Sequence, residues 1–152
     1  MITKKQFKQA LGVPLREAGF TSRGQSWYLS SEKSIVMIGA EKSSYDEKYW
    51  LDFGVWLKGI EDNDFPKSNH CHIQDRLDEL FPNGSNIFEA ACSLERGSQQ
   101  SLDELTSFLR TDVVPFCMKC LDLNELTKLM AEGRFSRSLV MRVARDALLQ
   151  KK

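Results

Sequence analysis

The chain has 152 residues, of which 41% are hydrophobic and 28% charged, and its formal net charge is zero. This length and composition predict one ordinary globular domain over residues 1–152. The balanced charge argues against a general nucleic-acid binder, and no apolar run reaches the roughly 18 residues that a membrane-spanning helix needs.

The N-terminal segment indicates the compartment. Residues 1–13 lack the apolar stretch of a secretory signal, so we expect a cytoplasmic protein. In that compartment cysteines stay reduced, and we expect free thiols in place of a disulfide framework at all four of them: Cys71, Cys92, Cys117 and Cys120.

The first half of the chain predicts a helix followed by strands. Thr3 and Gln6 fit a capping box that opens a helix, and we expect Gly19 to end it. Three runs then have strand character, with strict alternation in the last: 24–29, 34–40 and 49–57. Their short connections predict an antiparallel meander, because a parallel pair needs a longer crossover.

The second half predicts mainly helices. Ser68 or Asn69 caps a predicted helix whose apolar stripe extends to Phe81. Residues 86–94 fit either a fourth strand or a short helix. Three further helices are predicted, with caps at Ser101 (paired with Glu104), Asp122 and Ser136, and with a kink before Pro115. The segregated order predicts an α+β fold, with an antiparallel sheet of three to four strands flanked by an N-terminal helix and several C-terminal helices.

Several local patterns recur in a known family. They are Phe7 with Leu11 and Leu15, Gly19-Phe20, Gly24, Trp27-Tyr28, the stretch 42–45, the strand 49–57, Cys71-His72-Ile73 and Arg76-Leu77. In this order and spacing the chain resembles the bacterial domain-of-unknown-function family 4304 over roughly residues 3–80. The resemblance implies a small bacterial protein and brings no activity or functional residues. By analogy of kind, small bacterial domains of this make-up often look like immunity proteins, which bind and block secreted toxins.

The stretch 68–81 carries the main candidates for chemistry. Zinc would need four tetrahedral ligands, and His70, Cys71 and His72 do not have the usual ligand spacing, so we expect no metal. The Cys117-x-x-Cys120 pair lies inside a predicted helix, where two small buried side chains are the favoured interpretation over a zinc or redox pair. Adjacent Cys71 and His72 would point apart on a helix and could not act as nucleophile and base. The chain has no glycine-rich phosphate motif, and we expect no cofactor and no catalytic residue.

The charge distribution and two tryptophans suggest a binding surface. Residues 61–104 hold ten acidic against three basic residues, a net charge of −7, whereas residues 133–152 hold six basic residues and one acidic residue, a net charge of +5. Trp50 and Trp56 share one face of the strand 49–57 and become interface anchors unless helices cover that face as well. The candidate interface is therefore Glu61, Asp62, Asp64, Asp75, Asp78, Glu79, Trp50 and Trp56.

Two functions remain open from the sequence. The first is a non-catalytic protein that binds a protein partner, such as a bacterial toxin, with its acidic surface over a basic cleft. The alternative is an enzyme or small-ligand-binding protein with a pocket near Tyr45, His72 and Arg76. His72 and Arg76 are four residues apart, so on a helix they would share one face.

Overall fold

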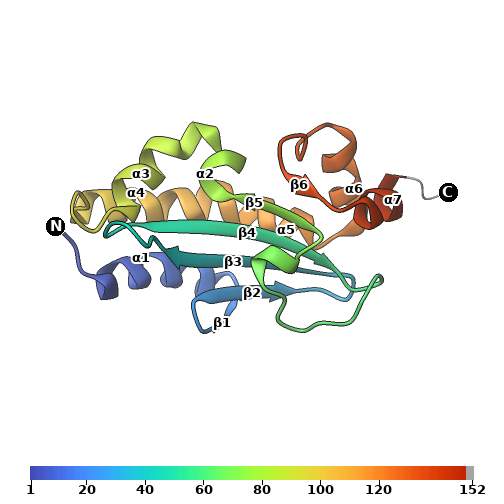
Figure 1. Ribbon diagram of the computed structural model, residues 1–152, viewed down its shortest axis with the longest axis horizontal. Coiled ribbons are helices and arrows are strands. Elements are labelled where there is room, and N and C mark those ends of the chain that lie inside the picture. Colours follow the sequence, from blue (N-terminus) through green and yellow to red (C-terminus); the bar gives the residue numbers. More distant parts are fainter. Residues whose placement is uncertain (150–152) are drawn as a thin grey trace.

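The computed structural model describes residues 1–149 and has an α+β fold in which a helix precedes a sheet and further helices follow it (Figure 1). The sheet is an antiparallel meander with strands in chain order: β1 (Thr21–Arg23), β2 (Ser26–Ser30), β3 (Ser34–Lys42), β4 (Tyr49–Leu57), β5 (Ile73–Arg76) and β6 (Leu139–Val140). The helices are α1 (Lys4–Glu17), α2 (Leu77–Leu80), α3 (Ser85–Cys92), α4 (Gln99–Phe108), α5 (Val114–Cys120), α6 (Leu123–Ala131) and α7 (Arg142–Leu149). Lys151 and Lys152 of the predicted basic end lie outside the described residues.

The predicted fold class is confirmed, and so are the elements that local signals specify. The Thr3 hydroxyl accepts a hydrogen bond from the Gln6 backbone, and the Gln6 side chain accepts one from the Thr3 backbone, which completes the capping box of α1. The helix ends before Gly19, whose φ of 104° lies in the left-handed region that favours glycine. The Asp122 carboxylate caps α6 by accepting from the Asn124 and Glu125 backbone N–H groups.

The sheet has six strands, in place of the three to four expected. The main correction concerns the helix predicted from Ser68 or Asn69, because residues 73–76 form β5. The helical parts of this segment are a short 3-10 turn, Ser68–His70, and the single turn α2. Strand β5 pairs with β4, so that Asp52 faces Arg76 and Val55 faces Ile73. The apolar pattern suits both structures, and pairing satisfies backbone groups of β4 that an edge strand would leave open.

Two helix starts also differ from expectation, those of α4 and α7. Residues 86–94, which the sequence left open, fall largely in α3. Ser98 caps α4, with Ser101 three residues inside the helix, so the cap predicted at Ser101 was wrong. The last helix begins at Arg142 and not after Ser136, because residues 139–140 are extended in β6 and pair with β5. The irregularity predicted before Pro115 is a π-helical segment, Leu109–Val113, between α4 and α5.

The core lies on one face of the sheet. Helices α1, α4 and α5 lie on the same side of the strands in Figure 1, and their apolar residues pack with those of the strands in one cluster. Tyr49, Phe53 and Val55 of β4 point into this cluster, and Tyr49 stacks on Phe7 of α1 at 4.7 Å between ring centroids. Within residues 1–149, none of the helices combines the length and apolar character that a membrane crossing requires.

Candidate functional site

The opposite face of the sheet, called the open face here, carries the alternate residues of β4: Trp50, Asp52, Gly54 and Trp56. One end of it is covered by the loop of residues 58–71. The Tyr28 hydroxyl donates to the Pro66 carbonyl at 3.1 Å, and the Trp56 Nε1–H donates to the Glu61 carbonyl at 2.8 Å. Under this loop, a second apolar cluster is buried: Tyr28, Ile35, Met37, Trp56 and Cys71.

The other end of the open face, called the polar end, is not covered by this loop. Strand pairing places Glu41 beside Trp50 and Asp52 beside Arg76. Of the three tryptophans only Trp50 is not buried, and its indole has the Lys48 ammonium at 4.0 Å and the Arg76 guanidinium at 4.3 Å from the ring centroid. Two cation–π contacts therefore hold this indole in place.

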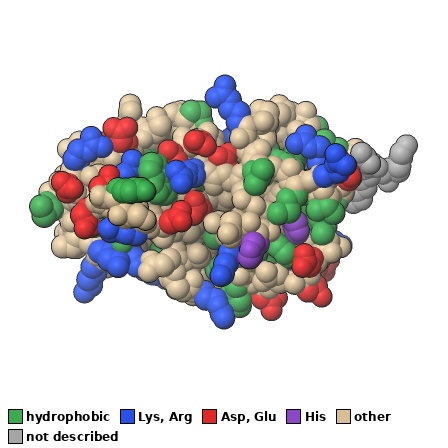
Figure 2. All heavy atoms as spheres, in the orientation of Figure 1, with side chains coloured by type: hydrophobic (Ala, Val, Ile, Leu, Met, Phe, Trp, Pro, Cys, Tyr) green, Lys and Arg blue, Asp and Glu red, His purple; other side chains and the backbone are tan. Residues whose placement is uncertain are grey.

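Figure 2 shows the open face in the same view as Figure 1. Towards one end, charged side chains of both signs gather around a hydrophobic group, and towards the other end hydrophobic side chains surround the histidines. The two ends therefore differ in chemistry, one being mixed-charge and aromatic and the other combining apolar, imidazole and acidic side chains.

Asp52 is the half-buried carboxyl of the polar end. Burial raises its pKa, the negative charge of Glu41 raises it further, and Arg76 and the Ser68 hydroxyl act in the opposite direction. Asp52 also borders a surface groove with Asn69, Gln74, Arg76, Glu79, Arg137 and Leu139. The polar end thus combines one aromatic ring with closely spaced charges of both signs.

His72 has a defined protonation pattern. Its Nδ1 accepts a hydrogen bond from the Leu57 backbone N–H at 2.9 Å, and its ring lies 4.2 Å from that of Trp56. A neutral imidazole has one lone-pair nitrogen, so the proton resides on Nε2. His72 can therefore donate a hydrogen bond from Nε2. While the Leu57 bond is intact, Nε2 has no lone pair and the lone pair of Nδ1 is occupied, so neither nitrogen can act as a base or a metal ligand.

The surroundings of His72 favour this neutral form. The side chain is buried, and burial lowers its pKa, while the Glu61 carboxylate acts in the opposite direction. His72 borders a groove together with Trp56, Ile60, Glu61, Asn63, Asn69, His70, Met141 and Val143. The structure thus places His70 and His72 at one groove and assigns His72 a structural bond to β4.

The cysteines lie in unreactive surroundings. All four are buried free thiols, and burial raises the pKa of Cys71, Cys92 and Cys120 to about 12 each. Burial also raises the pKa of Cys117, next to Cys120 on α5. In the part of the chain that the structure describes, no group of three or more His, Cys, Asp or Glu residues is arranged to hold a metal ion; the absence of bound metal remains a prediction.

The predicted acidic residues fall into an exposed group on the loop, a group on α2 in which Asp78 is half-buried and Glu79 exposed, and one inward residue. Glu61, Asp62 and Asp64 lie in the loop that covers the Trp56 end, and Asp78 and Glu79 lie on α2, next to the polar end. Asp75 pairs across from Phe53 and accepts a 2.6 Å hydrogen bond from Ser138. Of the two predicted tryptophans, Trp56 is buried and Trp50 is half-buried.

The alternative pocket residues do not lie together. Tyr45 is 98% exposed in the β3–β4 turn, whereas His72 is 2% exposed beneath the loop, and Arg76 lies over Trp50. Sequence reasoning missed Lys48 as a partner of Trp50. The alternation of β4, extended by two residues to Lys48, was the signal that could have identified it.

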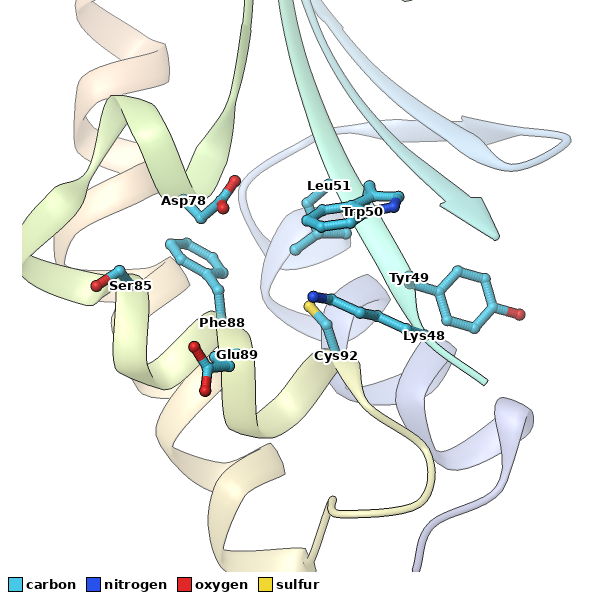
Figure 3. Close-up of a pocket in the computed structure, with 9 residues that line it drawn as sticks. All are labelled: Lys48, Tyr49, Trp50, Leu51, Asp78, Ser85, Phe88, Glu89 and Cys92. Carbon is cyan, nitrogen blue, oxygen red and sulfur yellow. The ribbon is translucent and has the colours of Figure 1, made fainter. Parts of the chain in front are cut away.

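The Trp50 side chain also borders a cavity of about 100 Å³ between β4, α2 and α3 (Figure 3).

The chain matches one known protein family. The profile described as Domain of unknown function (DUF4304) matches residues 11–119, which is more than half of the chain. The chain belongs to this family. The match confirms the resemblance to this family; it begins at residue 11, within α1, and continues beyond residue 80 into α5. No curated protein and no solved structure matches the chain.

Proposed function

We propose that this protein is a cytoplasmic, non-catalytic binding protein that uses the open face of its sheet to contact a protein partner, acting as an immunity-type antitoxin that occludes a toxin. The observation that carries this proposal is Trp50, a partly exposed indole clamped between Lys48 and Arg76 at the polar end. Tryptophan is the residue type most enriched among interface anchors, and an anchor that is already rigid loses little side-chain entropy on binding.

The acidic groups of the loop and of α2 suit a basic partner, whereas Lys48 and Arg76 beside Trp50 suit carboxylates on that partner. The acidic groups on the loop and on α2 lie at the two ends of the open face, so a partner that covers the whole face meets carboxylates at each end. Nucleases and other enzymes that hold phosphate have basic clefts, and carboxylates facing such a cleft accelerate association and compete with the substrate.

The geometry of the titratable groups also favours binding over catalysis. His72 Nδ1 is occupied by the Leu57 N–H, and the four thiols are buried with raised pKa values. A cysteine nucleophile needs a thiolate, and a histidine base needs an available lone pair; the buried thiols and His72 supply neither. These side chains serve packing and sheet formation in this fold.

The proposal is tested with a partner isolated from the native host with this chain as bait. Dissociation of the purified complex is then measured for the wild type, Trp50→Ala and the control Tyr45→Ala, which removes an aromatic ring that is 98% exposed in the β3–β4 turn. We expect Trp50→Ala to accelerate dissociation by roughly thirtyfold, the equivalent of about 2 kcal/mol for an anchor residue. Tyr45→Ala should leave the rate unchanged.

Inhibition is the second measurement. A toxin partner should lose activity at one equivalent of wild-type protein and regain it when Trp50→Ala is used at the same concentration. If Trp50→Ala binds and inhibits like the wild type, the proposed interface is wrong; if the isolated partner retains full activity in the complex, the antitoxin role is wrong.

A second candidate function is the binding of a small ligand. It is favoured by the cavity beside Trp50, whose walls carry one ammonium group and two carboxylates. None of Tyr45, His72 and Arg76, around which the pocket was predicted, lines this cavity, although Arg76 contacts Trp50 beside it.

A further inference from the structure

The cavity beside Trp50 has an unusual combination of walls. Figure 3 shows Lys48 reaching from the start of β4 so that its ammonium group ends next to the Cys92 thiol, with Trp50 on one side and with Asp78 and Phe88 across the space. The side chains that line it come from three segments: β4 with Lys48 before it, α2 and α3. The space is therefore built by segments up to 44 positions apart along the chain.

Two opposite charges line this space without pairing. Lys48 and Asp78 are both half-buried, and within residues 1–149 neither forms an ion pair at 4.0 Å or less. Glu89, the other carboxylate of the wall, already pairs with Arg96 at 3.6 Å. Half-buried charges lose part of their hydration, and their attraction for a counter-charge is stronger than in bulk water.

The remaining walls are apolar or neutral. Trp50 and Phe88 present aromatic surfaces, and Phe88 is itself buried. The Cys92 thiol stays protonated because burial raises its pKa to about 12. A volume of about 100 Å³ is larger than one water needs and smaller than the roughly 300 Å³ at which clefts for drug-sized ligands begin.

We propose that this cavity binds a small zwitterion of the amino-acid class, with the ligand carboxylate on Lys48 Nζ, the ligand ammonium on the Asp78 carboxylate and the short carbon chain between Trp50 and Phe88. A molecule with both charges pairs both walls at once. The Asp78 carboxylate would stay unpaired and repel a ligand that carries only a negative charge. The Lys48 ammonium would likewise repel a ligand that carries only a positive charge. Charge complementarity therefore selects the zwitterion over either half of it.

Titration calorimetry with defined probes tests this site. Glycine, β-alanine and γ-aminobutyrate are zwitterions with increasing charge separation, and propionate and propylamine each carry one of the two charges. At millimolar concentration we expect saturable binding of at least one zwitterion. Because each charge-assisted hydrogen bond that a probe lacks weakens binding by roughly ten- to a hundredfold, propionate and propylamine should bind more weakly by that factor.

Two variants and two matched controls locate the binding. Lys48→Met and Asp78→Asn should each weaken the best zwitterion by the same factor. The controls are Lys33→Met, at an exposed lysine outside the cavity, and Glu79→Gln, next to Asp78 along the chain but not part of the wall. Both controls should bind like the wild type.

A measurement on the wild type covers the case in which a variant fails to fold. Nuclear Overhauser contacts should connect the ligand methylene protons to the Trp50 indole and the Phe88 ring. The proposal is overturned if no zwitterion binds, if propionate or propylamine binds as tightly, if the folded variants retain full affinity, or if the contacts come from other residues. Because these probes need no protein partner, their failure leaves the antitoxin proposal standing, and the reverse also holds.

Discussion

Replacing His72 isolates one buried hydrogen bond of the open face. In His72→Ala the Leu57 N–H loses its acceptor, His72 Nδ1 at 2.9 Å, and Trp56 loses the ring that lies 4.2 Å from its own. An unpaired buried donor costs about 1–3 kcal/mol, and an aromatic contact contributes about 0.5–1.5 kcal/mol. We expect a loss of about 2–4 kcal/mol in the free energy of unfolding.

A second substitution separates the two contributions. In His72→Asn the Oδ1 atom occupies about the position of Nδ1 and can still accept from Leu57. We therefore expect His72→Asn to lose about 1–3 kcal/mol less than His72→Ala, the range of the unpaired donor. His70→Ala removes the other histidine, which is exposed, and should change stability by less than about 0.5 kcal/mol.

The comparison of the wild type with His72→Asn also gives a test of pH dependence. Burial lowers the folded-state pKa of His72 below the value of about 6.5 expected for the unfolded chain, against the opposing charge of Glu61. Between the two pKa values the unfolded chain binds more protons, so stability rises with pH in that window. The His72 contribution is complete above about pH 6.5 and is lost as the pH falls through the folded-state pKa.

Urea unfolding followed by far-UV circular dichroism measures these differences without depending on the fluorescence of Trp56. The wild type should lose stability relative to His72→Asn as the pH falls from about 8 to 5, because only the wild type titrates at this position. Equal losses in His72→Ala and His72→Asn, or a difference between the wild type and His72→Asn that stays constant with pH, would refute this account of the bond.

Three further predictions concern packing, the thiols and the acidic loop. A Cβ on Gly54 would lie 2.5 Å from the Cys71 Sγ, so Gly54→Ala should cost about 1–3 kcal/mol in urea unfolding, whereas Gly59→Ala, with open space around it, should be nearly neutral. At about pH 8 the buried thiols should react with a thiol reagent only after unfolding, and elemental analysis should find no stoichiometric metal; one zinc per chain that is lost in Cys117→Ser would contradict this. Replacing Asp62 and Asp64 together with lysine should slow association with the isolated partner, most at low salt, and leave the unfolding curve unchanged; equal association rates would show that the loop does not steer binding.

Elements with local signals could be predicted from the sequence. The capping box at Thr3, the left-handed Gly19 and the Asp122 cap act within a few residues of the positions they organise. The alternation of apolar and polar residues over 49–57 likewise predicts β4, since successive side chains of a strand point to opposite faces of the sheet. The α+β class follows from the order of these elements.

The segment 68–81 shows where local signals end. Its apolar spacing fits a helix, yet Ile73–Arg76 is extended because β4 offers a row of unpaired backbone groups next to it. Strand β6 forms 63 or more positions later in the chain, on the far side of β5. No local pattern encodes such an encounter, because its stabilisation comes from backbone pairing between distant segments.

The features of the candidate site also divide into those that the sequence predicts and those that depend on the tertiary structure. The sequence by itself placed Trp50 and Trp56 on one face of β4 and identified a segment rich in acidic residues, because alternation and charge are local properties. Only the tertiary structure decided that the loop 58–71 buries Trp56 and leaves Trp50 at the polar end. It also brought Lys48 and Asp78 to one cavity, since burial and the unpaired state of a charge depend on atoms contributed by distant parts of the chain.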